Sequence, residues 1–197
     1  MQIRIIICLV LGLTALQLNA QDDAAVEAAK KQEVWEETVS YAGRFQVSAP
    51  GYMVEKTDTL ETKLGQQVNH TFFYQSPDKK SDNLFYMVSY VDYPEGTMHM
   101  DSVDLLGEFF EASAEEAAFS ITGDLVYSNP RDWNGYPGQV WRVDYLKGQA
   151  IIKTRAFLVE NRYYTIQTIM LRDNSLNPST QKFFDSFYLL DGDASGN

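Results

Sequence analysis

Apolar and polar residues alternate with a period of two along much of the chain, the pattern of strands that turn one face to a core. The first clear run covers 45–49 and is ended by a Pro-Gly pair. Similar runs predict further strands at 52–60, 68–75 and 84–92. The polar spacer 76–83 predicts a solvated loop between the last two of these strands.

After position 101 the apolar period changes to three or four residues, which is typical of an amphipathic helix. Asp101 stands where an N-cap with an acidic first turn belongs. We expect a helix over 103–121 that lies on the sheet. Its apolar side is formed by Val103, Leu106, Phe110, Ala114, Ala117 and Ile121.

An acidic stripe runs beside this apolar side and consists of Asp104, Glu108, Glu111 and Glu115. No Lys or Arg occurs between 101 and 124 to balance it. Two interpretations stay open. The stripe is either a docking face for a cationic partner or for weakly held divalent ions, or the solvated face of an acidic protein.

The second half of the chain contains three consecutive strand patterns at 139–146, 149–159 and 162–171. They follow a short apolar run at 125–127 and a turn-rich stretch at 129–138. The two joints between the three strands, Lys-Gly and Glu-Asn, are two residues long. Joints of this length make tight hairpins and fix the register of the strands.

A closing helix is predicted from Asn177 as N-cap and Pro178 as first helical residue. Phe183, Phe184 and Phe187 share its apolar side. Strands, a long helix, more strands and a final helix predict an α+β fold, with an antiparallel β-sheet covered by helices. No repeat or second domain is visible.

The ends of the chain differ in composition from the body. Residues 1–20 read as a secretory signal, with Arg4, an apolar run of about a dozen residues and a small-residue cleavage site. We interpret 21–40 as an acidic, Ala/Glu-rich tether or frayed helix, 41–190 as the folded domain and 191–197 as a disordered tail. The chain is therefore expected to be exported, to the periplasm or the extracellular space. No segment reaches the length needed for membrane insertion.

Four short motifs add a family resemblance to this outline. They are RFQVSAPGY at 44–52, GYPG at 135–138 leading to WRVDY at 141–145, TRAF at 154–157 followed by RYY at 162–164, and FFDSF at 183–187. In this order they resemble the PsbP-like superfamily, which is named for an extrinsic subunit of photosystem II and also contains exported bacterial proteins of unassigned role. The resemblance implies an α/β/α sandwich and a binding or assembly role, and it carries over no catalytic residue.

Charge and cysteine content narrow the possible functions. The chain of 197 residues has a net charge of −11, which becomes −12 once the signal with its single charge, Arg4, is removed. An acidic protein is repelled by nucleic acids and by anionic membrane surfaces. The only cysteine, Cys8, lies in the signal, so the exported part is neither a disulfide scaffold nor a thiol enzyme nor a Cys-ligated zinc protein.

Catalytic and metal-binding patterns are sparse. The two histidines, His70 and His99, would have to converge with a carboxylate such as Asp101 to bind a metal, and their spacing matches no metal motif. The sequence contains no Gly-x-Ser-x-Gly elbow, phosphate-binding loop or dinucleotide fingerprint. We therefore expect no catalytic residue, no metal site and no cofactor.

One segment reverses the acidic balance of the chain. From Arg131 to Arg172 there are seven basic residues and three acidic ones. With two-residue hairpins, Arg142 lies opposite Lys153, on a sheet face that also carries Asp144. The other face, with Trp141 and its neighbours, is the expected core.

This basic face has two interpretations. It is either a cross-strand charge ladder on a solvated surface, or a shallow site where Arg side chains and aromatic edges hold an anionic group. The candidate binding residues are Arg142, Lys153, Arg155 and Tyr164 on this face, and Trp133 and Tyr136 in the preceding loop.

The leading prediction is an exported, non-catalytic, monomeric binding or assembly module. Its partner would be a protein or a small anionic ligand bound through the basic sheet face. The alternative is a small exported ligand carrier or hydrolase with a cavity between the sheet and the long helix. A filled core and an exposed charged patch would favour the first, and a pocket under the helix the second.

Overall fold

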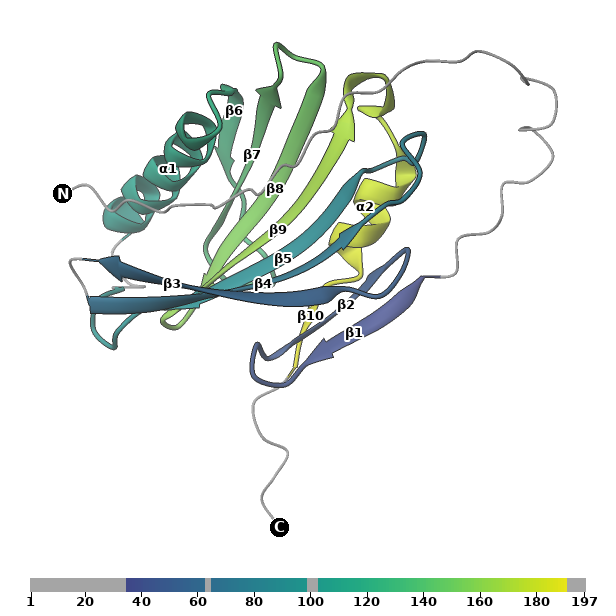
Figure 1. The fold of residues 1–197 in the computed structure, drawn as a ribbon. Coiled ribbons are helices and arrows are strands. Elements are labelled where there is room, and N and C mark those ends of the chain that lie inside the picture. The colour runs from purple at the N-terminus through teal and green to yellow at the C-terminus, as the bar shows by residue number, and fades with distance from the viewer. Residues whose placement is uncertain (1–34, 63–64, 99–102, 191–197) are drawn as a thin grey trace, which may run out of the picture.

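The computed structural model of the chain describes residues 35–62, 65–98 and 103–190. Within these ranges the chain forms two antiparallel sheets, two α-helices and a short 3-10 helix (Figure 1). The strands are β1 (Glu36–Ser40), β2 (Phe45–Ala49), β3 (Val54–Thr62), β4 (Gly65–Gln75), β5 (Phe85–Asp92), β6 (Asp124–Pro130), β7 (Gly138–Tyr145), β8 (Ala150–Val159), β9 (Arg162–Leu171) and β10 (Tyr188–Leu189). The helices are α1 (Val103–Ser120), α2 (Pro178–Asp185) and the 3-10 helix η1 (Arg172–Asn174). This is the α+β fold predicted from the sequence.

The larger sheet has the strand order β3-β4-β5-β9-β8-β7-β6. Antiparallel pairing of β5 with β9 joins the strands that precede α1 to those that follow it. The smaller sheet has the order β1-β2-β10. In Figure 1 the larger sheet is strongly twisted, with α1 at its β6 and β7 end and with α2 and the smaller sheet at the other side.

Helix α1 covers one face of the larger sheet, against β6 and β7. The small side chains of Ala114, Ala117 and Ala118 allow a close approach to the strands, and Leu106 and Phe110 fill the layer between them. The sheet contributes Trp141, Val143, Ile152, Leu158 and Tyr163 to this cluster. Both the helix and the core face predicted for the meander are confirmed.

The aromatic part of the opposite face of the same strands is also buried, and here the expectation of a solvated face is wrong. Phe157, Tyr164 and Ile166 are each at most 1 % exposed. Phe45 of β2 and Phe187 next to α2 belong to the cluster that covers them. The covering segments come from the two ends of the chain, so alternation within the meander gave no sign of this second layer.

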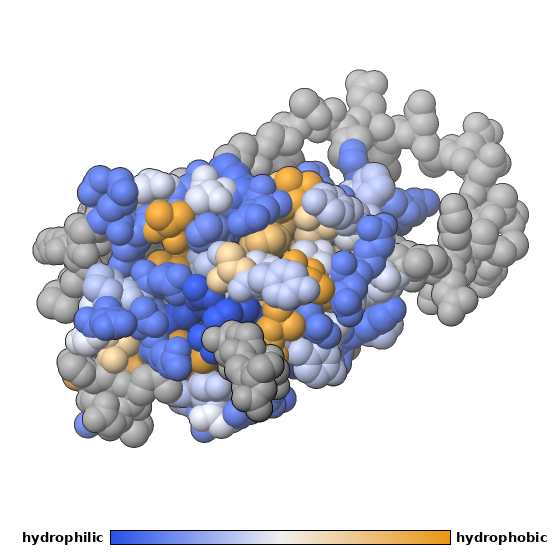
Figure 2. Space-filling view, turned by 90° about the horizontal axis from the view of Figure 1, so that it is seen from below, coloured by the Kyte–Doolittle hydropathy of each residue, from blue (hydrophilic) through white to orange (hydrophobic). Residues whose placement is uncertain are grey.

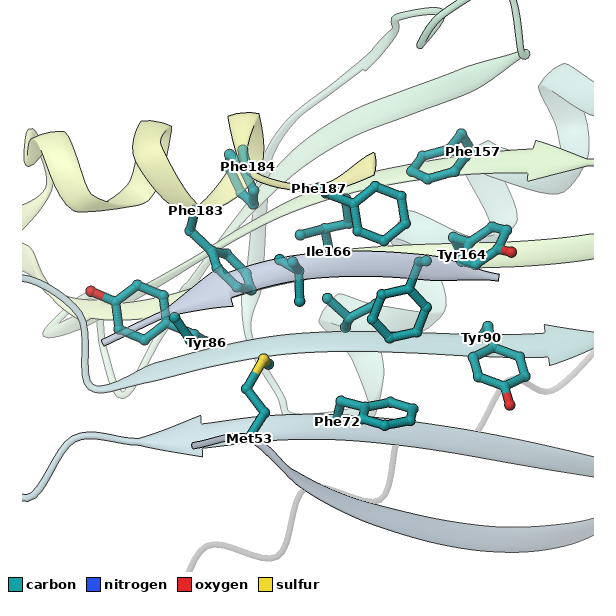
Figure 3. Packing of buried hydrophobic residues seen from close by; sticks show 14 of the residues in the cluster. Met53, Phe72, Tyr86, Tyr90, Phe157, Tyr164, Ile166, Phe183, Phe184 and Phe187 are labelled. Carbon is teal, nitrogen blue, oxygen red and sulfur yellow. The ribbon is translucent and has the colours of Figure 1, made fainter. Parts of the chain in front are cut away.

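The closing helix anchors to this second layer (Figure 3). Phe183, Phe184 and Phe187 are 0 %, 5 % and 2 % exposed, and Figure 3 shows Phe183 beside Tyr86 and Phe187 beside Ile166, toward Phe157. The side chain of Asn177 accepts a hydrogen bond of 2.8 Å from the backbone N–H of Thr180, the N-cap that the sequence predicted. Apolar burial and capping together explain where this helix begins and how it is held.

The N-terminal strand β1 differs from the prediction, which placed its residues at the end of the tether. It pairs with β2 over its full length, from Glu36 opposite Ala49 to Ser40 opposite Phe45. Backbone pairing needs little apolar surface, which explains why composition failed to identify this strand. Trp35 packs against the core beside it. The signal 1–20, the rest of the tether at 21–34, the tail 191–197, Asp101 and His99 lie outside the described residues.

The meander has the register expected from its short joints. Arg142 lies opposite Lys153 across β7 and β8, and Phe157 lies opposite Tyr164 across β8 and β9. At the first joint Lys147 and Gly148 have φ angles of 55° and 79°, the left-handed backbone that a tight two-residue turn requires. The predicted pairing of the candidate residues is therefore confirmed.

Candidate anion-binding site

Three of the six candidate residues lie together on the larger sheet. Arg142 on β7 is directly opposite Lys153 on β8, and Arg155 is two residues along β8 on the same face. We call Arg142, Lys153 and Arg155 the basic patch. All three are partly exposed at the margin of the layer formed by α2. The three cations of the patch come from two neighbouring strands, and α2 borders them at Arg155.

Arg142 forms a two-point ion pair with Asp144 on its own strand. Its Nε and Nη2 atoms donate to the two oxygens of Asp144 at 2.7 and 3.2 Å, and Arg172 donates to the same carboxylate at 2.5 Å. Burial alone would raise the pKa of Asp144, but the hydrogen bonds from the two guanidinium groups outweigh it and hold this pKa below its usual range. Asp144 is thus already shared between two cations.

Lys153 has no such partner among the described residues. Its Nζ atom donates a hydrogen bond of 2.6 Å to the carbonyl oxygen of Ser175, in the loop before α2, and forms no ion pair within the described ranges. Burial lowers the pKa of the Lys153 ammonium, and the charge of Arg142 lowers it further. The charge of Lys153 is therefore the least compensated in the patch.

Arg155 lies over α2. Its guanidinium carbon is 4.6 Å from the ring centre of Phe184, and its nitrogens are 3.4 Å from Asp185 and 3.3 Å from Gln181. These two polar contacts are long. Burial lowers the pKa of Arg155, followed by the charge of Arg131, although an arginine of this kind stays protonated. The positive charge of Arg155 is thus only weakly compensated by Asp185.

Tyr164 does not belong to the exposed site that the sequence predicted. It is 1 % exposed, its hydroxyl donates a hydrogen bond of 2.7 Å to the carbonyl oxygen of Gly43, and burial raises its pKa. Its ring stacks on Phe157 at 5.2 Å. Tyr164 holds the β1–β2 turn against the larger sheet.

Trp133 and Tyr136 likewise face the core. Their backbone N–H and carbonyl groups pair with each other in both directions at 2.9 Å, around a turn at Asn134 and Gly135. The Trp133 ring is stacked 4.7 Å from that of Phe157, and both Trp133 and Tyr136 pack partly buried against the cluster. The structure therefore separates the six candidates into a set of partly exposed cations and an aromatic set that closes the core.

Sequence reasoning missed Tyr127 as a neighbour of the patch. This residue lies on the edge strand β6, directly opposite Arg142, and is 39 % exposed. A bulge between Leu125 and Tyr127 shifts the register, so Tyr127 shares the face of Arg142 instead of the face of Trp141. No pattern in a seven-residue strand signals such a bulge. Arg131, close enough to affect Arg155, was counted in the basic segment but not placed.

Other chemistry is limited in the described part of the chain. His70 forms an exposed pair with Glu55 at 3.0 Å and stacks on Tyr90, and no group of three potential metal ligands occurs in these ranges. Between α1 and the sheet, the side chains of both elements form a continuous cluster. The basic patch is the strongest candidate site.

Comparison with known proteins agrees with this architecture. The chain is similar to the solution structure of cyanobacterial PsbP (CyanoP) from Synechocystis sp. PCC 6803, with a TM-score of 0.51 and coverage of 87 % of this chain and 98 % of that one. The chain has a PsbP-like fold. The identity is 11 %, so the likeness to PsbP concerns the fold alone. No family model and no curated protein matches the sequence.

Proposed function

We propose that this chain is an exported, non-catalytic binding or assembly module whose basic patch holds an anionic ligand or an acidic segment of a partner protein. The observation that carries the proposal is the position of Arg142 directly opposite Lys153. Like charges in this arrangement destabilise a sheet. Asp144 compensates the charge of Arg142, so an anion bound at Lys153 would remove the repulsion that remains, and the patch is suited to a negatively charged partner.

The charges around the patch support this function. Asp144 already accepts hydrogen bonds from Arg142 and Arg172, and Lys153 has no carboxylate partner in the described ranges. A self-contained charge ladder would be expected to neutralise all of its cations. Guanidinium groups also bind carboxylates and phosphates through two parallel hydrogen bonds. An uncompensated cation beside two arginines favours ligand binding over a ladder.

The competing function, a carrier or hydrolase with a cavity beneath the long helix, has less support. Phe110, Ala114 and Ala117 of α1 pack in one cluster with Trp141 and Tyr163 of the sheet. On the face seen from below in Figure 2, hydrophilic side chains predominate, with several apolar areas between them. These features agree better with a filled fold that makes contacts through its surface.

Export is part of the proposal and rests on the signal-like segment at 1–20. Among the described residues, no helix has the length and apolar character needed to cross a membrane. The monomeric state and the anionic nature of the partner are likewise parts of this proposal.

A binding titration tests the function directly. We expect fluorescence anisotropy to detect a labelled hexaglutamate peptide bound to the purified chain, more weakly as salt is raised. Arg155→Gln should weaken this binding about tenfold, because a charge-assisted contact contributes about 1–3 kcal/mol. Lys56→Gln removes the same charge at β3, the far edge of the sheet, and should leave binding unchanged. Equal affinities for the two variants and the parent chain would contradict the proposal.

A further inference from the structure

Lys153 combines two properties that are unusual for a lysine at a protein surface. Arg142 lies directly opposite it across the sheet and its charge acts on the Lys153 amine, Arg155 lies two residues along the same face of β8, and the Nζ atom donates to a backbone carbonyl instead of a carboxylate. The two carboxylates nearest to these arginines are already engaged, because Asp144 is bound to Arg142 and Arg172 and Asp185 is bound to Arg155. Neighbouring cations and partial burial are the conditions that make a lysine amine nucleophilic.

We propose that Lys153 is a reactive amine that captures small anionic aldehydes or 2-oxo acids as a reversible covalent imine, with Arg142 and Arg155 holding the anionic group. This inference rests on the proposed anion-binding function and names the ligand class for the same patch. It adds a covalent bond, which anion binding alone does not require.

The step is balanced without any further reactant. The ammonium of Lys153 first releases a proton to solvent, and the free amine then attacks the carbonyl carbon to give a carbinolamine. Uptake of a proton and loss of water leave a protonated imine, so that ammonium and carbonyl compound yield iminium and water. The lowered pKa of Lys153 increases the fraction of free amine at neutral pH. The positive charge of the iminium replaces that of the ammonium, so the net charge of the bound complex stays complementary to the anion.

The other described lysines lack this environment, and three of them serve as internal controls. Lys56 is paired with Asp58 at 3.0 Å, and Lys182 lies 4.1 Å above the ring of Trp35. Lys147 is exposed at the tip of the β7–β8 hairpin. All four amines are present in one molecule, so their relative labelling is independent of protein concentration and reagent quality.

Reductive trapping with pyridoxal 5′-phosphate tests the inference, because this probe carries both an aldehyde and a phosphate. The purified chain is treated briefly with the probe, reduced with borohydride and mapped by peptide mass spectrometry. We expect Lys153 to be labelled about tenfold faster than Lys147, since a lowered pKa and nearby arginines both favour reaction with an anionic aldehyde. Inorganic phosphate should slow this labelling, and Lys153→Arg should abolish it while keeping the charge of the patch.

Matched reagents separate this inference from the proposed function. Pyridoxal lacks the phosphate, and we expect it to label Lys153 faster than Lys147 by a smaller factor, because only the lowered pKa of Lys153 then favours the reaction. Equal rates at the two lysines with pyridoxal 5′-phosphate would overturn the imine, and the same preference with both probes would overturn the role of Arg142 and Arg155 in holding the anionic group. If hexaglutamate still binds through Arg155 in that case, the anion-binding function stands without the covalent step. If Arg155→Gln leaves hexaglutamate binding unchanged, the proposed function itself fails.

Discussion

The indole ring of Trp133 lies nearly parallel to the ring of Phe157, with an interplanar angle of 21° and centroids 4.7 Å apart. The same indole meets Phe187 edge to face at 5.6 Å. A loop residue expected at a binding surface is therefore part of the aromatic layer between the sheet and the C-terminal segment. Replacing Trp133 should therefore affect the stability of the fold and leave ligand binding unchanged.

Trp133→Ala should lower the free energy of unfolding by about 1–3 kcal/mol, because a partly buried ring and two aromatic contacts are lost. Hexaglutamate binding by the folded variant should stay within twofold of the parent chain. Urea unfolding followed by circular dichroism, together with the anisotropy titration, checks both values. Asp132→Ala, at an exposed neighbour, is the control. If the variant keeps its stability but loses peptide binding, Trp133 contacts the ligand and is not mainly a packing residue.

Phe187 occupies the centre of the second core layer. It is 2 % exposed and contacts the rings of Phe45, Trp133, Phe157 and Tyr164 at 5.5–5.8 Å. Phe187→Ala should therefore cost about 3–5 kcal/mol, the range for removing a buried ring. Tyr188→Ala, at the adjacent 55 % exposed position, should cost much less. Similar unfolding midpoints for the two variants would mean that the C-terminal segment is a detachable arm.

The pairing of Arg142 with Lys153 could be predicted from the sequence because the hairpin joint leaves no freedom in the register. Residues 146–149 connect the two strands, with left-handed backbone at Leu146, Lys147 and Gly148, and the pairing of β7 with β8 runs without a register shift. The two-residue joint at Glu160 and Asn161 has the same effect, and Phe157 lies opposite Tyr164. Local chemistry thus determines which side chains become neighbours across the meander.

Which segments cover a sheet face depends on tertiary packing. The alternation of apolar and polar residues along a strand does not predict it. Arg155 and Phe157 share one face of β8, yet the arginine lies at the margin of α2 while the phenylalanine lies beneath the second layer. The difference depends on where β2 and the closing helix pack, at sequence separations of more than a hundred residues for β2. A bulge at one residue of β6 had a comparable effect on Tyr127. Both effects explain why the cations of the site were predicted and its aromatic surroundings were not.

Asp144 should make the stability of the chain sensitive to acid. Its folded-state pKa is below the ordinary value of about 4, so its contribution is fully present above that value and is lost as the pH falls through the folded-state pKa. The parent chain should therefore exceed Asp144→Asn in unfolding temperature at neutral pH, and the gap should shrink as the pH falls from about 5 to about 2. Differential scanning calorimetry measures the gap. A gap that stays constant across this range would mean that Arg142 and Arg172 do not stabilise the ionised carboxylate.

Alkaline pH should weaken the other side of the molecule, where Tyr93 is buried beneath α1. This tyrosine is 3 % exposed, packs edge to face on Phe109 at 5.8 Å, and has its pKa raised by burial to about 12. In the unfolded chain the hydroxyl ionises near its ordinary pKa of about 10. Below that pH the neutral group is fully compatible with the fold. Between about 10 and 12 the unfolded state releases its proton first, so stability falls as the pH rises, by about 1.4 kcal/mol per pH unit for this group.

Tyr93→Phe removes the ionisable hydroxyl and keeps the ring, so it should flatten this alkaline loss by up to about 2–3 kcal/mol at pH 12. The loss should not vanish, because burial also raises the pKa of Tyr163 and Tyr164. Urea unfolding at a series of pH values from about 9 to 12 gives the slope for each variant. Tyr52→Phe, at a 74 % exposed position, is the matched control and should follow the parent chain. If Tyr93→Phe and Tyr52→Phe lose stability with the same slope as the parent, the hydroxyl of Tyr93 is accessible to hydroxide in the folded state and α1 does not seal this face of the sheet.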